Sequence, residues 1–419
     1  GNTRLILVNK TDAGKEETVQ TGERYLREKQ WDQYDHVYDV DLKAYRAYGM
    51  KRIPTTIVVD EAGYVRAMRS SVLDAEGLEE LLEQAGYGHA KQQLAFLEKN
   101  MMNGEGGVYT AYLDSPGEPP KGHDVLSESM GLLMRCAVRL EDRALFDRCW
   151  NYVSERMLRG GVCAWYVAED GSQGTSNALL DDLRIARALY EAQTKWGGYA
   201  QPLEALAAGI LSRNLYEGQL SAFYDFRQER TGGSISLTYC DFGALDALAQ
   251  VRPEYGPLRE TLLQTVQGGF IGKQFPLYYA AFDYQSGVYS GDSLNTAEAL
   301  LTVYHLSEIG QAREETLQWL KENLQAGTLA ARYRVDGSAV EGYQYDSTAV
   351  FAITALIGQS TGDGELYRLA REKMEQYWLR DRAHPLYGAF SQKADGSDIQ
   401  SFDQLLPLTV YCNSQDARF

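Results

Sequence analysis

The stretch that decides the fold is Ser347–Gly358, STAVFAITALIG, which is followed closely by Glu365–Arg380, ELYRLAREKMEQYWLR. The first segment has little polar surface around a helix, whereas the second carries its charges along one side. A helix that is apolar all round is buried, and a helix with one charged side lies at the surface. The pair therefore predicts a helical hairpin with one inner and one outer helix.

The same pairing recurs along most of the chain. An additional helix over 89–102 pairs with the end of the series, so that six inner and six outer helices are expected. The predicted fold of residues 88–419 is an all-α (α/α)6 barrel. Its inner helices are expected to begin, at intervals of roughly 51 to 61 residues, near Asp124, Leu180, Asp241, Asp292, Tyr345 and Phe402.

The links between these helices fall into two kinds. Links from an inner to an outer helix are short, such as 139–142 and 309–311, whereas the returning links are long and rich in Gly and aromatic residues. All returning links must lie at the same end of the barrel. Long loops on a rigid scaffold commonly carry binding and catalytic residues, so we expect the functional site at that end.

The sequence of residues 1–87 follows a different pattern, in which expected short apolar strands alternate with expected amphipathic helices. The run Tyr48–Thr56, with Ile53 and Pro54 before a β-branched strand, resembles the C-terminal half of a thioredoxin fold. The resemblance implies an α/β thioredoxin-like domain in which the Ile53–Pro54 peptide is cis. No cysteine precedes Cys136, so there is no CxxC here. A docking or spacer domain is expected, with a redox dithiol upstream as the alternative.

Composition excludes several classes of function. The 58 acidic against 41 basic residues give a net charge of −17, which argues against nucleic acid as a partner. No apolar run approaches the length that spans a bilayer, so no membrane insertion is expected in this chain. The five histidines show no zinc-binding spacing, and neither a metal nor another cofactor is expected.

Carboxylates stand at the predicted start of every inner helix. Asp is a favoured helix N-cap, so each single residue has a structural explanation. Together, however, they predict an acidic depression with aromatic rings on the flanking loops, which suits a carbohydrate. The residues expected to bind substrate are Asp181, Asp182, Trp165, Tyr239, Asp241, Tyr289, Tyr345 and Asp346.

Glu128 differs from the capping residues because it lies one turn into its predicted helix. It is expected to be held against Met130 and Leu132 and so partly desolvated, as a general acid requires. The run Ser127–Met134, SESMGLLM, resembles the S-E-x-x-G-Y-G-M element of glycoside hydrolase family 8. Asp181–Ala186 resembles that family's D-L-x-I-A element. The resemblance runs over about residues 90–412.

The resemblance implies an inverting hydrolase, similar to an endoglucanase, that cleaves a β-linked polysaccharide with Glu128 as the proton donor. The family base lies in a Y-D-A-x-R element, of which only Asp292 is matched here, and Asp283 is the runner-up. Leu132 and Leu133 replace the family's Tyr and Gly. A catalytically inactive saccharide-binding relative therefore stays open, as does a redox or docking protein with a degenerate barrel.

The resemblance also sets expectations about the setting of the protein. Gly1–Thr3 is not a signal peptide, and a signal or anchor upstream of Gly1 is suspected, so a secreted or cell-surface bacterial protein that acts as a monomer is expected. Which β-glycan is cleaved stays open between glucan, xylan, chitosan and a mixed exopolysaccharide.

Overall fold

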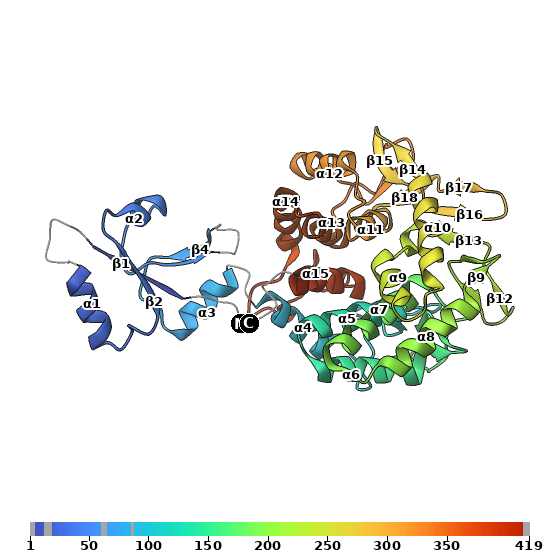
Figure 1. Cartoon of the computed structure of the whole chain (residues 1–419), viewed down its shortest axis with the longest axis horizontal. Coiled ribbons are helices and arrows are strands. Elements are labelled where there is room, and N and C mark those ends of the chain that lie inside the picture. Colours follow the sequence, from blue (N-terminus) through green and yellow to red (C-terminus); the bar gives the residue numbers. More distant parts are fainter. Residues whose placement is uncertain (1–4, 12–18, 60–64, 85–87, 414–419) are drawn as a thin grey trace. The chain divides into compact units, whose positions relative to one another are not determined.

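The computed structural model describes residues 5–11, 19–59, 65–84 and 88–413. The chain divides between His89 and Ala90 into two compact units (Figure 1). Each unit has its own helices and strands, and each is described by itself below.

The first unit alternates strands and helices in the predicted manner. Strand β1 pairs in parallel with β2, and β3 pairs with β4 in the antiparallel sense. Helix α1 packs on β1 and β2, because Gly22 lies against the side chains of Asn9 and Tyr38. The elements are β1 (Ile6–Lys10), α1 (Val19–Glu28), β2 (Asp35–Asp39), α2 (Lys43–Ala47), β3 (Thr56–Val59), β4 (Val65–Arg69) and α3 (Ala75–Gln84).

The Ile53–Pro54 peptide that precedes β3 is cis, as predicted. A cis bond is a minority state even for proline, so it distinguishes this turn from an ordinary Xaa-Pro link. The thioredoxin-like assignment of the unit as a whole stays a prediction.

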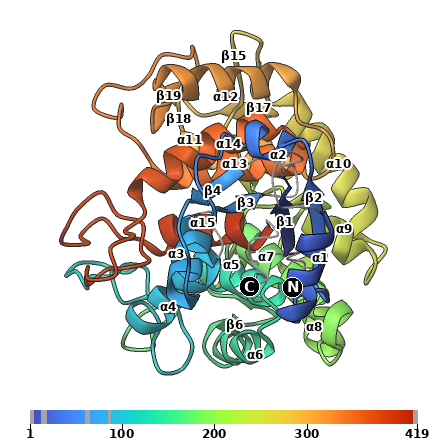
Figure 2. The same cartoon turned by 90° about the vertical axis from the view of Figure 1, so that its left-hand side faces the viewer.

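The second unit is built around a closed ring of inner helices (Figure 1). Each inner helix of the described residues packs against the next, and the last, α15, packs against the first, α5. In Figure 2, α15, α5 and α7 can be followed as neighbours in this ring. The inner helices are α5 (Ser127–Arg139), α7 (Leu179–Trp196), α9 (Phe242–Ala249), α11 (Thr296–Ser307), α13 (Thr348–Thr361) and α15 (Ser401–Asn413).

The outer helices follow their inner partners along the chain. They are joined to the ring by contacts such as α5 with α6, α7 with α8 and α13 with α14. Helix α4 is tied to α15 by a hydrogen bond from Gln93 Nε2 to the Gln404 carbonyl (2.5 Å). The outer helices are α4 (His89–Asn100), α6 (Arg143–Tyr152), α8 (Ala200–Arg213), α10 (Tyr255–Gly268), α12 (Glu314–Ala326) and α14 (Gly364–Met374).

The burial of α13 and α14 confirms the hairpin predicted from their sequence. Every residue of α13 from Thr348 to Gly358 is buried, whereas α14 buries only Leu366, Ala370, Arg371 and Met374. One apolar cluster extends through the inner helices and the inward sides of the outer ones. The (α/α)6 barrel is therefore the architecture of this unit.

Short strands and single helical turns occupy the links of the barrel. Among the described residues, one of these sheets has three strands in the order β13–β16–β17, which are Ser234–Ser236, Ala281–Asp283 and Val288–Ser290. The others are β5 (Val125–Leu126), η1 (Val153–Met157), β6 (Leu158–Arg159), β7 (Val162–Cys163), β8 (Tyr166–Val167), β9 (Leu215–Tyr216), β10 (Gln219–Leu220), β11 (Tyr224–Asp225), β12 (Arg230–Thr231), η2 (Leu237–Tyr239), β14 (Phe270–Gly272), β15 (Phe275–Tyr278), β18 (Ser293–Asn295), β19 (Arg332–Arg334) and η3 (Glu375–Tyr377).

Candidate active site

Glu128 is the second residue of α5, at the end where the chain enters the ring. The start of α5 is fixed by Ser127, whose N–H donates to the Trp165 carbonyl (3.0 Å) and whose Oγ donates to Asp181 Oδ2 (2.7 Å). The Glu128 side chain keeps 28% of its surface exposed, and its Oε2 accepts a hydrogen bond from Arg184 Nη1 (3.3 Å). The carboxylate is thus accessible and paired with a buried guanidinium.

The expectation that Glu128 lies against Met130 is wrong, whereas its contact with Leu132, four residues on, stays a prediction. Met130 is fully buried in the apolar core, whereas Glu128 faces Arg184. Residues two apart on a helix point in different directions, so Glu128 and Met130 are not neighbours in space. The contact that the Glu128 carboxylate makes is with a charged group, Arg184.

Three further carboxyl groups from other inner helices surround Glu128. Burial is the main cause that raises the pKa of Asp181 on α7 to about 7, and the charge of Glu128 adds to the rise. The Arg184 guanidinium, 3.8 Å away, acts in the opposite direction. Burial raises the pKa of Asp403 on α15 to about 6, with a smaller contribution from Glu128. Burial also raises the pKa of Glu298 on α11, where Arg332 opposes and Glu128 adds to the shift. These groups with Glu128 are called the carboxylate cluster.

Tyr239 lies within the electrostatic influence of the carboxylate cluster, and its predicted contact with substrate stays a prediction. Burial raises the pKa of this half-buried phenol, and the charges of Asp181, Glu128 and Glu298 add to the shift. The preceding residue, Thr238, donates its hydroxyl to the Glu298 carbonyl (3.0 Å). The turn η2 is therefore tied to the start of α11.

Asp182 and Asp241 are parts of the scaffold rather than of the accessible site. Asp182 accepts from the Cys163 N–H (2.8 Å) and from Asn177 Nδ2 (2.7 Å), and it holds the returning link. Asp241 caps α9 and pairs with Arg187 (3.1 Å). Arg187 follows the start of α7 by two turns, about 12 Å at 1.5 Å per residue, which places Asp241 well inside the ring. The predicted contact of these two with substrate is wrong, because both are buried.

Tyr289 and Asp346 are also engaged in internal contacts. The Tyr289 hydroxyl donates to the Thr265 carbonyl (2.6 Å), and its ring packs against Phe282 at 4.7 Å between centroids. The Asp346 carboxylate accepts from the Tyr377 hydroxyl. These contacts give both residues a structural role in the links.

The sequence predicted that an inner helix begins near Asp292, but Asp292 lies outside that helix. Helix α11 begins at Thr296 and is capped by Asn295, whose Oδ1 accepts from the Glu298 N–H (3.3 Å). Asp292 is exposed and precedes β18. The runner-up, Asp283, ends β16, and its Oδ1 accepts from the Ser286 N–H (2.8 Å) and hydroxyl (2.7 Å), which lowers its pKa.

Trp165 and Tyr345, both expected to bind substrate, each keep part of the ring exposed, and their contact with substrate stays a prediction. Trp165 is half-buried, stacks edge-on against Tyr166 at 4.7 Å and is linked through its carbonyl to Ser127. Tyr345 is 53% exposed beside Tyr343, with 6.1 Å between ring centroids. Arg332, which acts on Glu298, also lies over the Tyr343 ring at 5.1 Å. The exposed tyrosine pair and Glu298 thus have Arg332 as a common charged neighbour.

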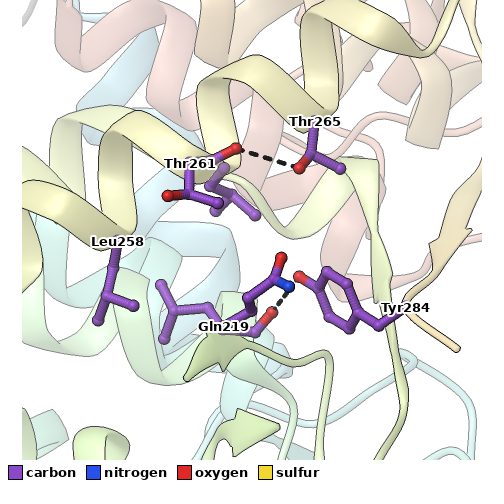
Figure 3. Close-up of a pocket in the computed structure, with 7 residues that line it drawn as sticks. Gln219, Leu258, Thr261, Thr265 and Tyr284 are labelled. Carbon is purple, nitrogen blue, oxygen red and sulfur yellow. Dashed lines mark hydrogen bonds between the residues drawn. The ribbon is translucent and has the colours of Figure 1, made fainter. Parts of the chain in front are cut away.

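A separate depression on the barrel carries no chemistry of this kind. Figure 3 shows Gln219, Leu258, Thr261, Thr265 and Tyr284 around it, with the Tyr284 hydroxyl donating to the Leu220 carbonyl (2.5 Å). Its lining residues include no carboxylate. Within the described ranges there is also no group of three or more His, Cys, Asp and Glu side chains that could hold a metal ion. In the same ranges, no helix combines the length and apolarity that crossing a membrane requires.

The raised pKa of Asp181 predicts a specific pH dependence of stability. The carboxyl group of an unfolded Asp titrates at about pH 3.9. The contribution of Asp181 to the free energy of unfolding is therefore fully present below about pH 4, and it is lost as the pH rises through about 7. Asp181→Asn can still accept from Ser127 but does not titrate. We expect its melting temperature to fall less than that of the wild type between about pH 5 and 8. Parallel falls in the two proteins would contradict this assignment.

Comparisons with known proteins agree with the barrel and with its acid-bearing segment. Residues 114–218, which include Glu128 and Asp181, match the model of glycosyl hydrolases family 8. The chain is 25% identical to YdaJ, a candidate lipoprotein of Bacillus subtilis, over 322 residues, or 75% of this chain and 84% of that one. It is 30% identical to endoglucanase A of Acetivibrio thermocellus over 121 residues, or 27% of this chain and 24% of that one.

Among solved structures, the barrel is similar to a novel alpha-amylase from Clostridium perfringens. The two share 28% identity with a TM-score of 0.72, over 78% of this chain and 98% of that chain. The resemblance to glycoside hydrolase family 8 predicted from the sequence is confirmed by these matches. They also support the assignment of the chain to the glycoside hydrolases.

Proposed function

We propose that this chain, whose barrel resembles the family 8 glycoside hydrolases, is an inverting enzyme that cleaves a β-linked polysaccharide with Glu128 as the general acid. The observation that supports the proposal most strongly is the position of Glu128. It is the accessible carboxylate of the matched S-E element, and other carboxyl groups converge on it from α7, α11 and α15. Inverting hydrolysis needs two carboxyl groups separated by a substrate and a water.

The roles of the neighbours follow from their contacts. Arg184 orients the Glu128 carboxyl group through its hydrogen bond, and Ser127 links α5 to Asp181. Tyr239 offers a ring face and a hydroxyl beside the carboxylate cluster. Trp165 and Tyr345 are proposed to contact sugar rings, for which flat apolar faces with polar tips are suited.

An α-glycosidic bond is a second candidate for the linkage that is cleaved. The solved structure to which the barrel is similar carries the name alpha-amylase, and it shares 28% identity with this chain over 98% of its own length. An α-linked glucan is therefore a proposed alternative to the β-linked glycans expected from the sequence. Both readings use the same acid, and they differ in the configuration of the bond that enters the site.

A substrate panel separates these readings. The purified chain is incubated with β-1,4-glucan, xylan, chitosan, a bacterial exopolysaccharide and an α-1,4-glucan, and new reducing ends are measured. Glu128→Gln serves as the blank for contaminating activity. Cleavage of a β-linked member alone supports the first reading, and cleavage of the α-glucan alone supports the second. Binding without cleavage would favour the inactive saccharide-binding relative.

The exposed tyrosine Tyr345 gives a further prediction. Tyr345→Ala removes a ring that is 53% exposed at the edge of the proposed cleft. We expect KM for long oligosaccharides to rise by about 2- to 10-fold, the value of one aromatic contact, with little change in kcat. Tyr25→Ala, which removes a similarly exposed ring in the first unit, is the matched control. Equal KM values for both variants would remove Tyr345 from the substrate site.

For the first unit we propose a thioredoxin-like domain that serves as a spacer or docking module. Its order of strands and helices supports this assignment. We further propose that the protein acts as a monomer in the extracellular space or at the cell surface. The similarity to YdaJ, itself a candidate lipoprotein, supports that location.

A further inference from the structure

We propose that Glu298, rather than Asp292 or Asp283, is the catalytic base that activates the attacking water opposite Glu128. This inference rests on the proposed hydrolase function and extends it. It assigns a role to a residue that the sequence analysis did not select.

The position of Glu298 in the ring suits a partner of Glu128. The described inner helices follow the order α5, α7, α9, α11, α13 and α15, so α11 stands opposite α5. Glu298 is the third residue of α11, and Glu128 is the second residue of α5. Both side chains are accessible, and the charge of Glu128 acts on Glu298. An opposed pair leaves space for a sugar and a water, which neighbouring helix starts do not.

The backbone of Glu298 is held on two sides. Its N–H donates to Asn295 Oδ1 (3.3 Å), and its carbonyl accepts from Thr238 Oγ1 (3.0 Å). The start of α11 is further fixed by β18, where Asn295 pairs with Arg332 of β19. These contacts come from three separate parts of the chain. A base must be positioned to within a few tenths of an ångström of its water, and such support supplies that order.

The carboxylate itself is available for a water molecule. In the part of the chain that the structure describes, no hydrogen bond or ion pair engages the Glu298 carboxylate, whereas Asp403 accepts from the Ala349 N–H (3.0 Å). Asp181 accepts from Ser127, and Asp283 accepts from Ser286. Asp403, Asp181 and Asp283 are thus occupied by structural contacts. Asp292 is exposed as well, but it precedes β18 and lies outside α11. Burial raises the pKa of Glu298, which strengthens it as a base as long as it is ionised.

The proposed step balances without a cofactor. The oxygen of water forms a bond to the anomeric carbon while one water proton passes to the Glu298 carboxylate. The bond from the anomeric carbon to the glycosidic oxygen breaks, and that oxygen takes the proton of Glu128. The products are a hemiacetal of inverted configuration and a second saccharide whose former glycosidic oxygen is now a hydroxyl group. Glu298 then returns its proton to solvent, and Glu128 regains one.

The test compares Glu298→Gln with two rivals and one matched control. On the glycan that the wild type cleaves, Glu298→Gln is expected to lower kcat by roughly 10²- to 10⁴-fold with little change in KM. Glu314→Gln, which changes a first-turn glutamate of the outer helix α12, is the control and should keep the wild-type rate. The rivals are Asp292→Asn and Asp283→Asn. Melting temperatures show whether any loss comes from unfolding.

A second readout separates a base from a residue that only supports the fold. In Glu298→Ala, azide can enter the space of the carboxylate and attack without needing a base. Recovery of turnover, with a glycosyl azide of inverted configuration seen by NMR, is expected. A purely structural residue would show no such rescue.

The outcomes are distinct. If Glu298→Gln cleaves at the wild-type rate while Glu128→Gln is inactive, the hydrolase function stands and the inference about Glu298 is overturned. The same holds if Asp292→Asn or Asp283→Asn alone abolishes turnover. If the wild type cleaves no member of the panel, the proposed function fails, and the role of Glu298 fails with it.

Discussion

Glu128→Gln is expected to lower kcat by roughly 10²- to 10⁴-fold on a natural glycan while leaving the melting temperature unchanged. The amide has nearly the same shape as the carboxyl group and can remain beside Arg184, 3.3 Å from the present oxygen. It cannot donate the acidic proton that the departing sugar needs. Steady-state kinetics on purified wild type and variant measure the loss.

The role of Glu128 as an acid has its own control. An aryl glycoside with an acidic phenol as leaving group departs without protonation, so Glu128→Gln should lose much less activity on it than on the natural glycan. Equal losses on both substrates would indicate that Glu128 positions the substrate instead. Wild-type activity of the variant on the natural glycan would place the acid elsewhere.

Arg187→Met is expected to destabilise the barrel by about 3–5 kcal/mol. Arg187 on α7 donates two hydrogen bonds to Glu308 (2.9 and 2.8 Å) and one to Asp241 (3.1 Å), and it contacts Glu191 at 3.3 Å. These charges lie inside the ring, and Asp241 is almost fully buried. Removing the cation leaves Asp241 and Glu308 without their main partner. The cost is far larger than the net contribution of such a pair, because uncompensated charges stay buried.

The matched control for Arg187 is an exposed pair on an outer helix. Arg368→Met removes an arginine that contacts Glu372 at 2.9 Å, where both side chains are about half exposed. Such pairs contribute about 0.3–0.5 kcal/mol. Chemical denaturation of both variants compares the two losses. A loss for Arg187→Met as small as that for Arg368→Met would show that the buried charges do not depend on this arginine.

The barrel could be predicted from the sequence because burial leaves a clear mark on helices. STAVFAITALIG has almost no polar side to turn to water, and α13 is buried throughout over these residues. Its partner, with charges on one side, forms α14 and buries only a narrow stripe. When such pairs of one apolar and one amphipathic helix repeat along the chain, a closed ring is one of the few folds that buries all the apolar helices.

The functional roles of single acidic residues could not be predicted in the same way. Aspartate near a helix start serves capping, loop anchoring and catalysis alike, and the sequence does not distinguish them. Asp241 caps α9 and lies inside the ring, Asp182 anchors a link, and Asp283 closes a hairpin. Only the three-dimensional contacts separate these residues from Glu128 and Asp181.

Glu298 was missed because its local signal has a structural explanation. Asn295 followed three residues later by Glu298 is the spacing of a helix N-terminus, and Asn295 does cap α11 through the Glu298 N–H. Nothing in the sequence shows that the carboxylate stands across the ring from Glu128. That relation depends on the closure of the ring, which places α11 on the side opposite α5.

The central claim, inverting hydrolysis with Glu128 as the acid, is tested most directly by following the first product by ¹H NMR. The purified protein is mixed with the glycan that it cleaves, and the anomeric signals are recorded before mutarotation proceeds. The account predicts that a β-linked glycan first gives the α-anomer, and that an α-linked glucan first gives the β-anomer. A first product with the configuration of the substrate would contradict inversion, and the absence of any new reducing end across the whole panel would contradict hydrolysis itself.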